Sequence, residues 1–323
     1  MFDSVLTGAN FSGANLTKAQ LDRTTLEDVD FTNAEIRGAK LYEATAKGFT
    51  AAQLYSTASY RAGNLASTSL RGNDLVGWDL SHLCLIGVDF TNSYLETANL
   101  SGSDTRGTKR LETSTAITTN LIHPDGYVAG LHLAADDTMR LWDYNQTPSI
   151  DIMVEDGMSL SATSTLRLVF EDDAWGSTLN FVEGIDVALA GTLELLLDES
   201  VDTVSLAGST FQLFDWTGVE PTGEFDSIVL AAGTTWDLSQ LYETGAVTLL
   251  MPGDFNADGL VNLADYTVWR DQGGSFEDYQ LWKNHFGQAV PPSDTPDSQT
   301  VPEPSAWLLA LLAIGLPLVR RGR

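Results

Sequence analysis

Cysteine, basic residues and histidine are all scarce in this chain of 323 residues, and each shortage argues against a class of protein. The single cysteine, Cys84, rules out an internal disulfide framework. Only 17 Lys and Arg stand against 44 Asp and Glu, which gives a formal net charge of −27. Such a charge repels polyanions and attracts cations, so we expect no nucleic-acid partner.

The motifs of common catalytic sites are also missing. No two of the four histidines have metal-ligand spacing, no serine lies in a nucleophile elbow, and no glycine-rich loop would hold a phosphate. The carboxylate clusters Asp136–Asp137 and Glu171–Asp173 indicate turns, with paired carboxylates for glycoside cleavage as the alternative. His123 indicates a turn and His132 the solvent face of a strand. We therefore expect a protein that is not an enzyme.

The negative charge is concentrated in the middle of the chain. Residues 1–111 carry 12 acidic and 10 basic side chains, whereas residues 112–252 carry 23 and 2. Residues 253–287 carry 6 and 2, and the last 36 residues carry three of each. Few charges and many Gly, Ser and Thr residues predict a mainly β protein of several domains.

A large apolar residue recurs every five positions through the first third of the chain. The positions are Leu6, Phe11, Leu16, Leu21, Leu26, Phe31, Ile36 and Leu41, and then Tyr60, Leu65, Leu70, Leu75, Leu80, Leu85, Phe90, Leu95 and Leu100. A small residue usually lies two places earlier, as at Ala9 and Ala98. A period of five fits neither a helix nor a strand. It predicts a chain that turns a corner every five residues, with one large and one small side chain pointing inward.

Units such as 9–13 (ANFSG), 14–18 (ANLTK) and 98–102 (ANLSG) resemble the pentapeptide-repeat family. The resemblance implies a right-handed quadrilateral β-helix over residues 1–111, in which stacked coils bury the apolar column. Some members of this family mimic duplex DNA and protect topoisomerases. The nearly neutral charge of this segment disfavours that function here.

Two irregularities interrupt the repeats. The phase slips by one residue near 45–59, which indicates either a bulge or a helical insert. Trp78 and Leu83 occupy the position of the small residue, so we expect the wall of the coil to widen or distort around them.

Residues 118–251 lack the five-residue period and contain short apolar runs broken by Gly, Asp and Ser. These runs predict the strands of an acidic β-rich domain, either a solenoid or a sandwich. Segments 211–218 and 236–250 resemble the closing part of passenger-like β-solenoids in planctomycete-type surface proteins. Four tryptophans are candidates for a glycan-binding platform, with positions in the core as the simpler interpretation: Trp142, Trp175, Trp216 and Trp236.

Residues 252–287 contain a candidate calcium loop that begins at Asp254 and has Gly259 at its sixth position. Calcium binds six to eight oxygen ligands, and this spacing supplies them. The predicted ligands are Asp254, Asn256 and Asp258 through their side chains, Leu260 through its carbonyl, Asn262 through water and Asp265 as the closing carboxylate. A turn without metal is the alternative.

The loop and the helix expected after it resemble the dockerin domain. Asp278-Tyr279 and Trp282 repeat the Asp265-Tyr266 and Trp269 pattern, but residues 271–277 contain no second series of ligands. The resemblance implies a small helix pair with one calcium ion and, as a partner, a cohesin-like protein.

Residues 288–304 predict a flexible linker that ends in Val301, Pro302, Glu303 and Pro304. Residues 305–323 comprise an apolar run to 319 and a basic end, which predicts one C-terminal transmembrane helix. Together these elements resemble the PEP-CTERM sorting tail of Gram-negative bacteria. The resemblance implies cleavage near Pro302–Ser305 by an exosortase-like enzyme, and a permanent membrane anchor is the alternative.

These features predict an exported structural or adhesion protein of the cell surface or extracellular matrix. The first 13 residues have no basic region or apolar core of a signal peptide, so we expect the natural chain to begin further upstream. The alternative function is an accessory role in extracellular polysaccharide binding or degradation, docked through the dockerin-like segment.

Overall fold

The structure is a computed structural model, and it describes residues 3–144, 146–171, 175–198, 201–203 and 205–290. The helical elements are η1 (Thr45–Lys47), α1 (Ala51–Ser56), α2 (Ala58–Ala62), α3 (Leu263–Asp271) and α4 (Phe276–His285). The strands are β1 (Tyr127–Val128), β2 (Leu131–Leu133), β3 (Thr138–Trp142), β4 (Ile152–Val154), β5 (Met158–Leu160), β6 (Thr165–Phe170), β7 (Leu179–Phe181), β8 (Val187–Leu189), β9 (Thr192–Leu197), β10 (Thr210–Gln212), β11 (Thr222–Gly223), β12 (Ser227–Leu230), β13 (Thr235–Asp237) and β14 (Ala246–Leu250).

The N-terminal region winds into a four-sided coil of parallel rungs. Isolated β-bridges join residues that are 20 positions apart, as in Val5–Thr25 and Asn10–Asp30. Twenty residues make four sides of five, which matches the period of the apolar column, and its members are almost completely buried from Leu21 onward. The arrangement is a four-sided β-helix of parallel rungs. Its ladder continues past residue 111, to a bridge between Asp104 and Ile122.

Each corner of this coil is made by a residue with left-handed backbone geometry. Gly13 has a φ of 67° and Lys18 a φ of 59°, and similar values recur every five residues. The Asn or Asp directly before the column residue supports the turn, because its side chain accepts the amide two positions on. The Ser12 amide donates to Asn10 Oδ1 at 2.8 Å, for example. This local hydrogen bond explains why Asn and Asp follow the small residue in so many repeats.

A helical insert, and not a bulge, causes the phase slip. It consists of η1, α1 and α2, and it lengthens one turn of the coil. Lys40 pairs with Ser69, which is 29 positions away instead of 20, so this turn holds nine additional residues. The side chain of Gln53 fastens the insert to the rung below by donating to the carbonyls of Leu26 and Val29, both at 2.9 Å.

The insert also changes the role of two aromatic residues. Tyr60 lies in α2 and not in the apolar column, which resumes at Leu65. Trp78 occupies the small position of its repeat, and its ring centroid is 6.1 Å from Phe49 and 6.4 Å from Tyr55. The aromatic side chains around the insert therefore accommodate an indole that a regular rung of the coil could not enclose.

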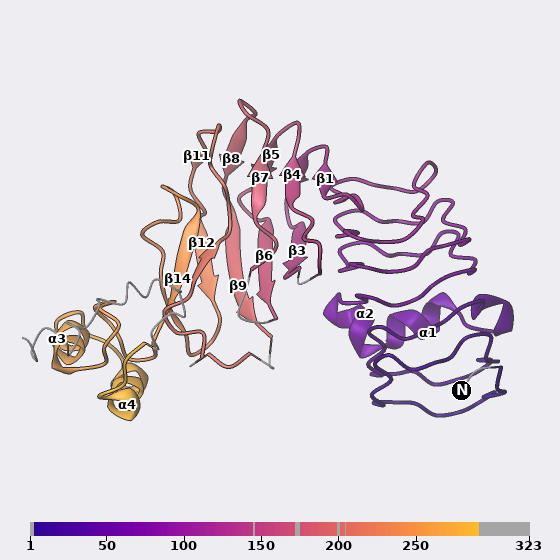
Figure 1. Ribbon diagram of the computed structural model, residues 1–323, viewed down its shortest axis with the longest axis horizontal. Helices are drawn as coiled ribbons and strands as arrows, with labels where there is room; N and C mark the ends of the chain where they lie inside the picture. Colours follow the sequence, from indigo (N-terminus) through magenta and orange to yellow (C-terminus); the bar gives the residue numbers. More distant parts are fainter. Residues whose placement is uncertain (1–2, 145, 172–174, 199–200, 204, 291–323) are drawn as a thin grey trace, which may run out of the picture. The chain divides into compact units, whose positions relative to one another are not determined.

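From Tyr127 the chain continues as a three-sided coil of parallel strands (Figure 1). Its walls are the sheets β1-β4-β7, β11-β8-β5-β2 and β12-β9-β6-β3. Leu166 pairs with Met139 and with Leu193, so one turn takes 27 residues. The last turn is longer, because Leu193 pairs with Ile228, 35 residues on. Of the two architectures expected for this region, the structure therefore has the solenoid.

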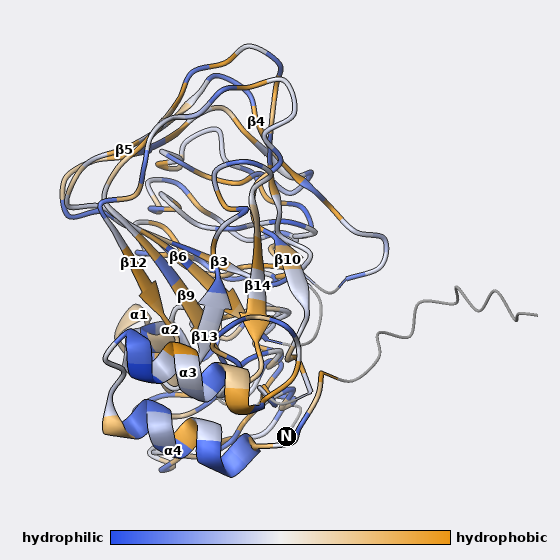
Figure 2. Cartoon of the chain, turned by 90° about the vertical axis from the view of Figure 1, so that its left-hand side faces the viewer, coloured by the Kyte–Doolittle hydropathy of each residue, from blue (hydrophilic) through white to orange (hydrophobic). Residues whose placement is uncertain are grey.

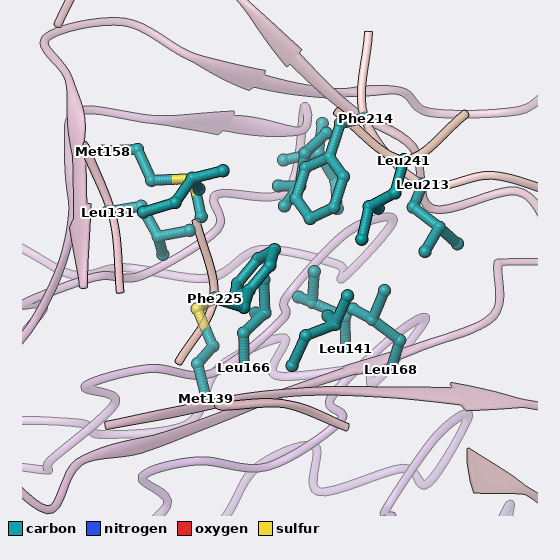
Figure 3. Packing of buried hydrophobic residues seen from close by; sticks show 14 of the residues in the cluster. Leu131, Met139, Leu141, Met158, Leu166, Leu168, Leu213, Phe214, Phe225 and Leu241 are labelled. Atoms are coloured by element: carbon teal, nitrogen blue, oxygen red, sulfur yellow. The ribbon is translucent and has the colours of Figure 1, made fainter. Parts of the chain in front are cut away.

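Alternate residues of the three walls point toward the coil axis and form its core. Figure 3 shows Leu131 and Met158 on one side and Met139 and Leu166 on another, with Phe225 between them. The antiparallel sheet β10-β14-β13 forms a separate sheet at the far end of this coil. Phe211, Trp236 and Leu249 of this sheet belong to the same buried core as the three walls.

The tryptophans considered as a glycan platform are mostly buried. Trp216 and Trp236 belong to the core of the three-sided coil, and Trp175 packs against that core. Trp142 lies in a second buried cluster. An exposed aromatic platform of these four residues is therefore wrong.

The two coils are joined along one side of the four-sided coil. We name this side the Cys84 face, after the ladder that runs through Asn64, Cys84, Asp104 and Ile122. Cys84 and Ile86 form a buried cluster with Trp142, Tyr144 and Val169 from the three-sided coil. Burial raises the pKa of the Cys84 thiol far above its usual range, so the side chain is a neutral apolar group at this junction.

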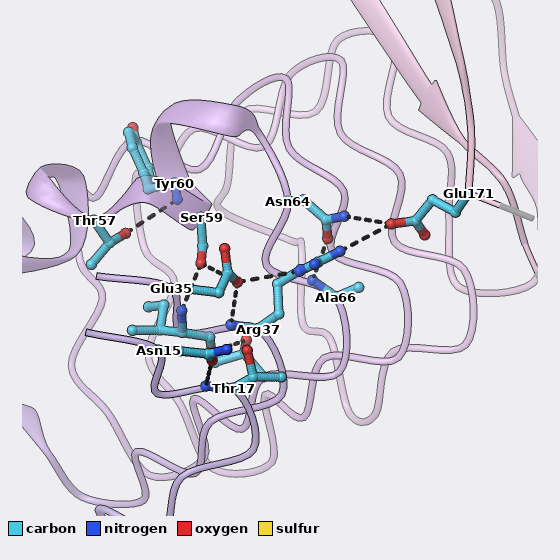
Figure 4. Close-up of polar contacts among 12 residues, drawn as sticks. Asn15, Thr17, Glu35, Arg37, Thr57, Ser59, Tyr60, Asn64, Ala66 and Glu171 are labelled. Carbon is cyan, nitrogen blue, oxygen red and sulfur yellow. Dashed lines mark hydrogen bonds and ion pairs between the residues drawn. The ribbon is translucent and has the colours of Figure 1, made fainter. Parts of the chain in front are cut away.

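Polar contacts surround this apolar cluster. Glu171, which follows β6, accepts hydrogen bonds from Arg37 at 3.0 Å and from Asn64 at 3.3 Å (Figure 4). Arg140, on β3, donates to the carbonyl of Ala62 at 2.7 Å. The contact between the two coils therefore has an apolar centre and a polar rim.

Arg106 is a fully buried charge in the same junction, and it uses all five of its N–H groups. Nε donates to Asp104 Oδ1 at 3.0 Å and Nη2 to Asp104 Oδ2 at 2.7 Å. Nη2 also donates to Ser177 Oγ at 2.6 Å, and Nη1 donates to the carbonyls of Ile150 and Gly176 at 3.1 and 3.3 Å. A buried arginine is tolerated only when its donors and its charge are satisfied in this way.

Helices α3 and α4 form a pair beyond the antiparallel sheet. Hydrophilic and hydrophobic segments alternate along both helices in Figure 2. Met251 and Val261 are buried together with Ala207 of the preceding coil, and Trp282 and Val290 pack against them. The helix pair is therefore packed onto the end of the solenoid and not tethered by a free linker.

Among the residues that the structure describes, no helix is long and apolar enough to cross a membrane. Residues 291–323, which include most of the expected linker, the sorting motif Val301–Pro304 and the expected transmembrane helix, lie outside the described residues.

Candidate metal centre

The candidate calcium loop begins four residues after β14 and ends in the first turn of α3. Its glycine, Gly259, has a φ of 80°, which a residue with a Cβ atom adopts only with strain. Asn262 caps α3 by accepting the amide of Ala264 at 2.7 Å. The loop is therefore fixed at both ends, by the solenoid on one side and by the helix on the other.

Two carboxylates of this loop, Asp254 and Asp265, are buried. Asp254 accepts the amides of Asp258 and Gly259 at 3.2 and 2.9 Å. Asp265 Oδ1 accepts the amide of Phe255 at 2.8 Å, and its other oxygen accepts the amide of Asn262 at 2.7 Å. The backbone of the loop therefore curves around each of the two aspartate side chains, which accept its amides.

The remaining predicted ligands lie on the exposed side of the loop. Asp258 Oδ1 accepts the amide of Leu260 at 2.9 Å, and its Oδ2 accepts from Asn256 Nδ2 at 2.9 Å. The carbonyl of Leu260 accepts from the Asn262 side chain at 3.2 Å. All six predicted ligands therefore belong to one connected group of hydrogen bonds between residues 254 and 265.

The electrostatics of the loop favour a bound cation. Burial raises the pKa of Asp254, and the nearby charges of Asp265 and Asp258 raise it further, while the amides that it accepts act in the opposite direction. Neither Asp254 nor Asp265 forms an ion pair with any described residue. A divalent cation would remove this repulsion, since it neutralises both carboxylates at once.

The donor set fits calcium in its chemistry, because it offers three carboxylates, two amide oxygens and a carbonyl. Across the described residues, however, no three His, Cys, Asp or Glu side chains are gathered closely enough to hold a metal by themselves. Apart from Asp258 Oδ2, which accepts from the Asn256 side chain, the carboxylate oxygens of the loop accept backbone amides, and the amide and carbonyl oxygens would have to complete the coordination.

A short antiparallel pairing supports the back of the loop. Leu260 is bridged to Ala289, the Val290 amide donates to the Gly259 carbonyl at 2.9 Å, and the Val261 amide donates to the Gln288 carbonyl at 2.9 Å. The Trp282 indole donates to the Asn262 carbonyl at 2.7 Å. Sequence reasoning did not find this pairing, because residues 287–290 read only as the end of a helix and the start of a linker.

The segment that would hold a second loop has another structure. Residues 272–275 connect the helices, and Ser275 caps α4 by accepting the amide of Asp278 at 3.1 Å. Asp278 in turn accepts the amide of Ser275 at 2.9 Å. Asp265 and Asp278 therefore occupy the same position of two capping boxes, and only the first is preceded by a series of oxygen ligands.

The other polar residues considered from the sequence lie apart from this loop. Asp136 is in a turn with a φ of 65°, and His132 is exposed on β2, both as predicted. His123 precedes a turn and lines an open hollow with Asp125 and Glu155. Of the cluster Glu171–Asp173, only Glu171 is described, and its carboxylate faces Arg37 and Asn64.

The comparison with protein families matches part of the first coil. The family of pentapeptide repeats matches residues 4–45, with eight copies of the repeat. A solved pentapeptide repeat protein from the thylakoid lumen of Arabidopsis thaliana is 19% identical, with a TM-score of 0.18; the match covers 38% of this chain and 63% of that protein, less than two thirds of its length. No curated protein sequence matches this chain.

Proposed function

We propose that this chain is a non-enzymatic structural or adhesion protein of the cell surface, with one calcium site that holds its C-terminal helix pair onto a double solenoid. The observation that carries the proposal is the pair of buried carboxylates, Asp254 and Asp265, which lie close together without a cationic side chain. Calcium binding to Asp254, Asn256, Asp258, the Leu260 carbonyl, Asn262 and Asp265 would compensate their charges.

Calcium would act here as a structural ion. It would hold the loop against Val261, which is buried with Met251 and Ala207, and so fasten the helix pair to the end of the coil. A protein outside the cell meets calcium at concentrations that fill sites of modest affinity. The calcium site and an exported location therefore support one another.

The proposed export route uses the C-terminal tail. The VPEP element at 301–304 and the apolar segment 305–319 would be recognised by an exosortase-like sorting enzyme, which cleaves near Pro302–Ser305. If the tail is retained, the apolar segment and the terminal arginines would anchor the protein in the membrane. Cell fractionation, combined with sequencing of the mature C-terminus, separates these two outcomes, and an intact soluble chain inside the cell would contradict both.

The calcium site is tested with two matched substitutions, Asp265→Asn and Asp278→Asn. Each changes the same position of a capping box, but Asp265 is buried and also accepts the amide of Phe255, so Asp265→Asn should cost more stability in the absence of calcium. The two variants are therefore compared by the calcium response of each and not by its absolute melting temperature. Only Asp265→Asn should remove the calcium response. At a free calcium concentration about 100 times the dissociation constant, linkage predicts a stabilisation of about 2.7 kcal/mol in the unsubstituted protein.

Thermal melts with calcium and with a chelator, read together with calorimetric titration, measure this response. The site would be supported if calcium raises the melting temperature of the unsubstituted protein and of Asp278→Asn but not that of Asp265→Asn. Identical melts of the unsubstituted protein in calcium and in chelator would mean that the loop is a turn without metal.

An accessory role in polysaccharide binding or degradation remains the second candidate. The dockerin-like segment suggests this role, and although the four tryptophans considered as a glycan platform are mostly buried, α3 and α4 expose Leu263 and Phe276 at 67% and 72%. Both side chains lie in the first turn of their helices, so a cohesin-like partner would contact them there. Topoisomerase protection by DNA mimicry is the least favoured function, because the first coil lacks the acidic surface that it needs.

A further inference from the structure

A polar groove of about 370 Å³ lies on a second side of the four-sided coil. We name this side the Lys40 face, after the ladder that runs from Gln20 through Lys40, Ser69 and Asp89 to Lys109. Lys40, Arg71 and Lys109 line the groove, together with Tyr42 and the two carboxylates Asp22 and Asp89. Three cations thus gather on one side of a molecule that carries a net charge of −27.

The charges of these three side chains are not neutralised by other described residues. Among the described residues, Lys40, Arg71 and Lys109 form no ion pair, whereas Arg37 and Arg106 do. Lys40, Arg71 and Lys109 are exposed. The Arg71 guanidinium lies 5.2 Å from the centroid of the Tyr42 ring, which orients it without neutralising its charge. Their positive charges are therefore available to a ligand.

The two carboxylates of the groove are partly occupied by the backbone. Asp22 Oδ1 accepts the amide of Tyr42 at 3.0 Å, and Asp89 Oδ1 accepts the amide of Thr91 at 2.9 Å. Each carboxylate has further lone pairs, which accept hydrogen bonds only from a donor. A ligand of this groove should therefore carry both anionic groups for the cations and hydroxyl groups for the carboxylates.

The rungs of the coil fix the spacing of the cations. Lys40 and Lys109 are three rungs apart, which is about 14 Å at the usual strand separation. Arg71 lies on the rung of Ser69, next to that of Lys40. A pyranose ring in an extended sugar chain spans about one rung, so a chain lying along the coil axis would place successive sugars against successive rungs.

We propose that the Lys40 face binds an acidic polysaccharide that contains uronic acid residues, with its carboxylates on Lys40, Arg71 and Lys109 and its hydroxyl groups on Asp22 and Asp89. The proposal deepens the adhesive function proposed above and rests on it for its biological setting. A nucleic acid fits the groove less well. Its phosphates offer no hydrogen-bond donors to the carboxylates, and its dense charge is repelled by the acidic second coil.

The test measures binding of polygalacturonate to the purified full chain in mild detergent. A chelator is present throughout, so that calcium bridges to the acidic coil cannot contribute. The double variant Lys40→Gln/Lys109→Gln is compared with Lys18→Gln/Lys47→Gln, in which two other exposed lysines of the same coil are replaced. Both variants lose the same charge, and only the first changes the groove.

We expect the groove variant to bind roughly tenfold more weakly and the control variant to bind as the unsubstituted protein does. Binding should weaken as salt is added, and neutral dextran should not bind. The single variant Arg71→Gln should show an intermediate loss. Circular dichroism melts that agree for both double variants would exclude misfolding as the cause of a loss.

Three outcomes would overturn the proposal. They are no binding of polygalacturonate, an equal loss in the two double variants, and preference for duplex DNA or for a second copy of the chain over the polysaccharide. None of these depends on export, so a failure here is distinguishable from a failure of the surface location, which cell fractionation decides.

Discussion

The two coils enclose their cores in different ways. The four-sided coil uses 20 residues per turn, one inward apolar side chain per side and a hydrogen-bonded corner every five residues, and it carries nearly equal numbers of acidic and basic residues. The three-sided coil uses 27 residues in its first turns and 35 in its last, with strands of two to six residues and loops of variable length. Residues 112–252, which contain this second coil, carry 23 acidic and 2 basic residues and thus −21 of the net charge of −27.

This difference is one of regularity. In the first coil each turn outside the helical insert repeats the same buried column and the same hydrogen-bonded corners. In the second coil the walls repeat but the loops between them differ in length, so its last turn is longer by eight residues while the same core continues. Contact between the coils joins a scaffold of regular turns to one whose turns differ in length.

The largest expected effect comes from breaking that contact. Arg106→Met should destabilise the protein by about 3 to 5 kcal/mol, because it leaves the Asp104 carboxylate buried without its partner. Differential scanning calorimetry should then resolve two transitions, one for each coil, in place of a single one. Arg37→Ala removes a half-exposed partner of Glu171 and serves as the control, with an expected cost of about 1 kcal/mol or less. A single unchanged transition in Arg106→Met would contradict the coupling of the coils.

Core truncation should distinguish the two coils next. Leu80→Ala and Leu195→Ala each remove a fully buried leucine, one from each coil, at an expected cost of about 2 to 5 kcal/mol. We expect the larger loss at Leu80, because the hydrogen-bonded corners restrict collapse of the coil around the cavity. Chemical denaturation measures both values. A clearly larger loss at Leu195 would mean that the three-sided coil is the more rigid of the two.

Lowering the pH should change the stability of the calcium loop in opposite directions with and without calcium. The folded-state pKa of Asp254 is raised, so in chelator the folded protein binds a proton more readily than the unfolded chain. Stability of the helix pair should then increase as the pH falls from neutral through that raised pKa toward the ordinary value of about 4. With calcium it should decrease over the same window, because protonation competes with the ion.

Melts at several pH values, with and without calcium, measure this inversion, and Asp254→Asn is the control that should remove it. If the melting temperature falls as the pH is lowered, both with and without calcium, Asp254 does not govern the stability of the loop.

The smallest expected effect concerns a corner of the first coil. Gly77 has a φ of 69°, and a Cβ added there would meet only the Thr97 hydroxyl, at 3.7 Å. Gly77→Ala should therefore cost about 1 kcal/mol through backbone strain alone. Gly233, at a φ of 76° in a loop of the second coil with open space around it, is the matched position. A similar cost at both would show that the corner geometry, and not its place in the repeat, determines the loss.

Residue spacing predicted the first coil well, because a five-residue period has few structural solutions. It also located the irregularity around residues 45–59, but could not assign Tyr60 to α2, since that residue keeps the period of the column. The second coil has no such period, and its strands pair over 26 to 35 residues, so a solenoid and a sandwich remained equally compatible with the sequence.

The candidate calcium loop is a local motif, and its predicted ligands are connected by hydrogen bonds within residues 254–265, while their binding of calcium stays a prediction. What supports it from outside is not local. Arg106, likewise, donates hydrogen bonds to Ile150 and Ser177, which lie 44 and 71 residues further along the chain. No pattern in the sequence predicts these contacts.

The pairing behind the loop has a mechanical consequence. Backbone hydrogen bonds join Val290 to Gly259 and Val261 to Gln288. The chain therefore leaves the helix pair alongside the calcium loop and antiparallel to it. A pull on the residues beyond Val290 loads these bonds before it reaches either helix. The force would thus act first on the segment between Gly259 and Val261. A calcium ion bound in the loop would resist extension of this segment.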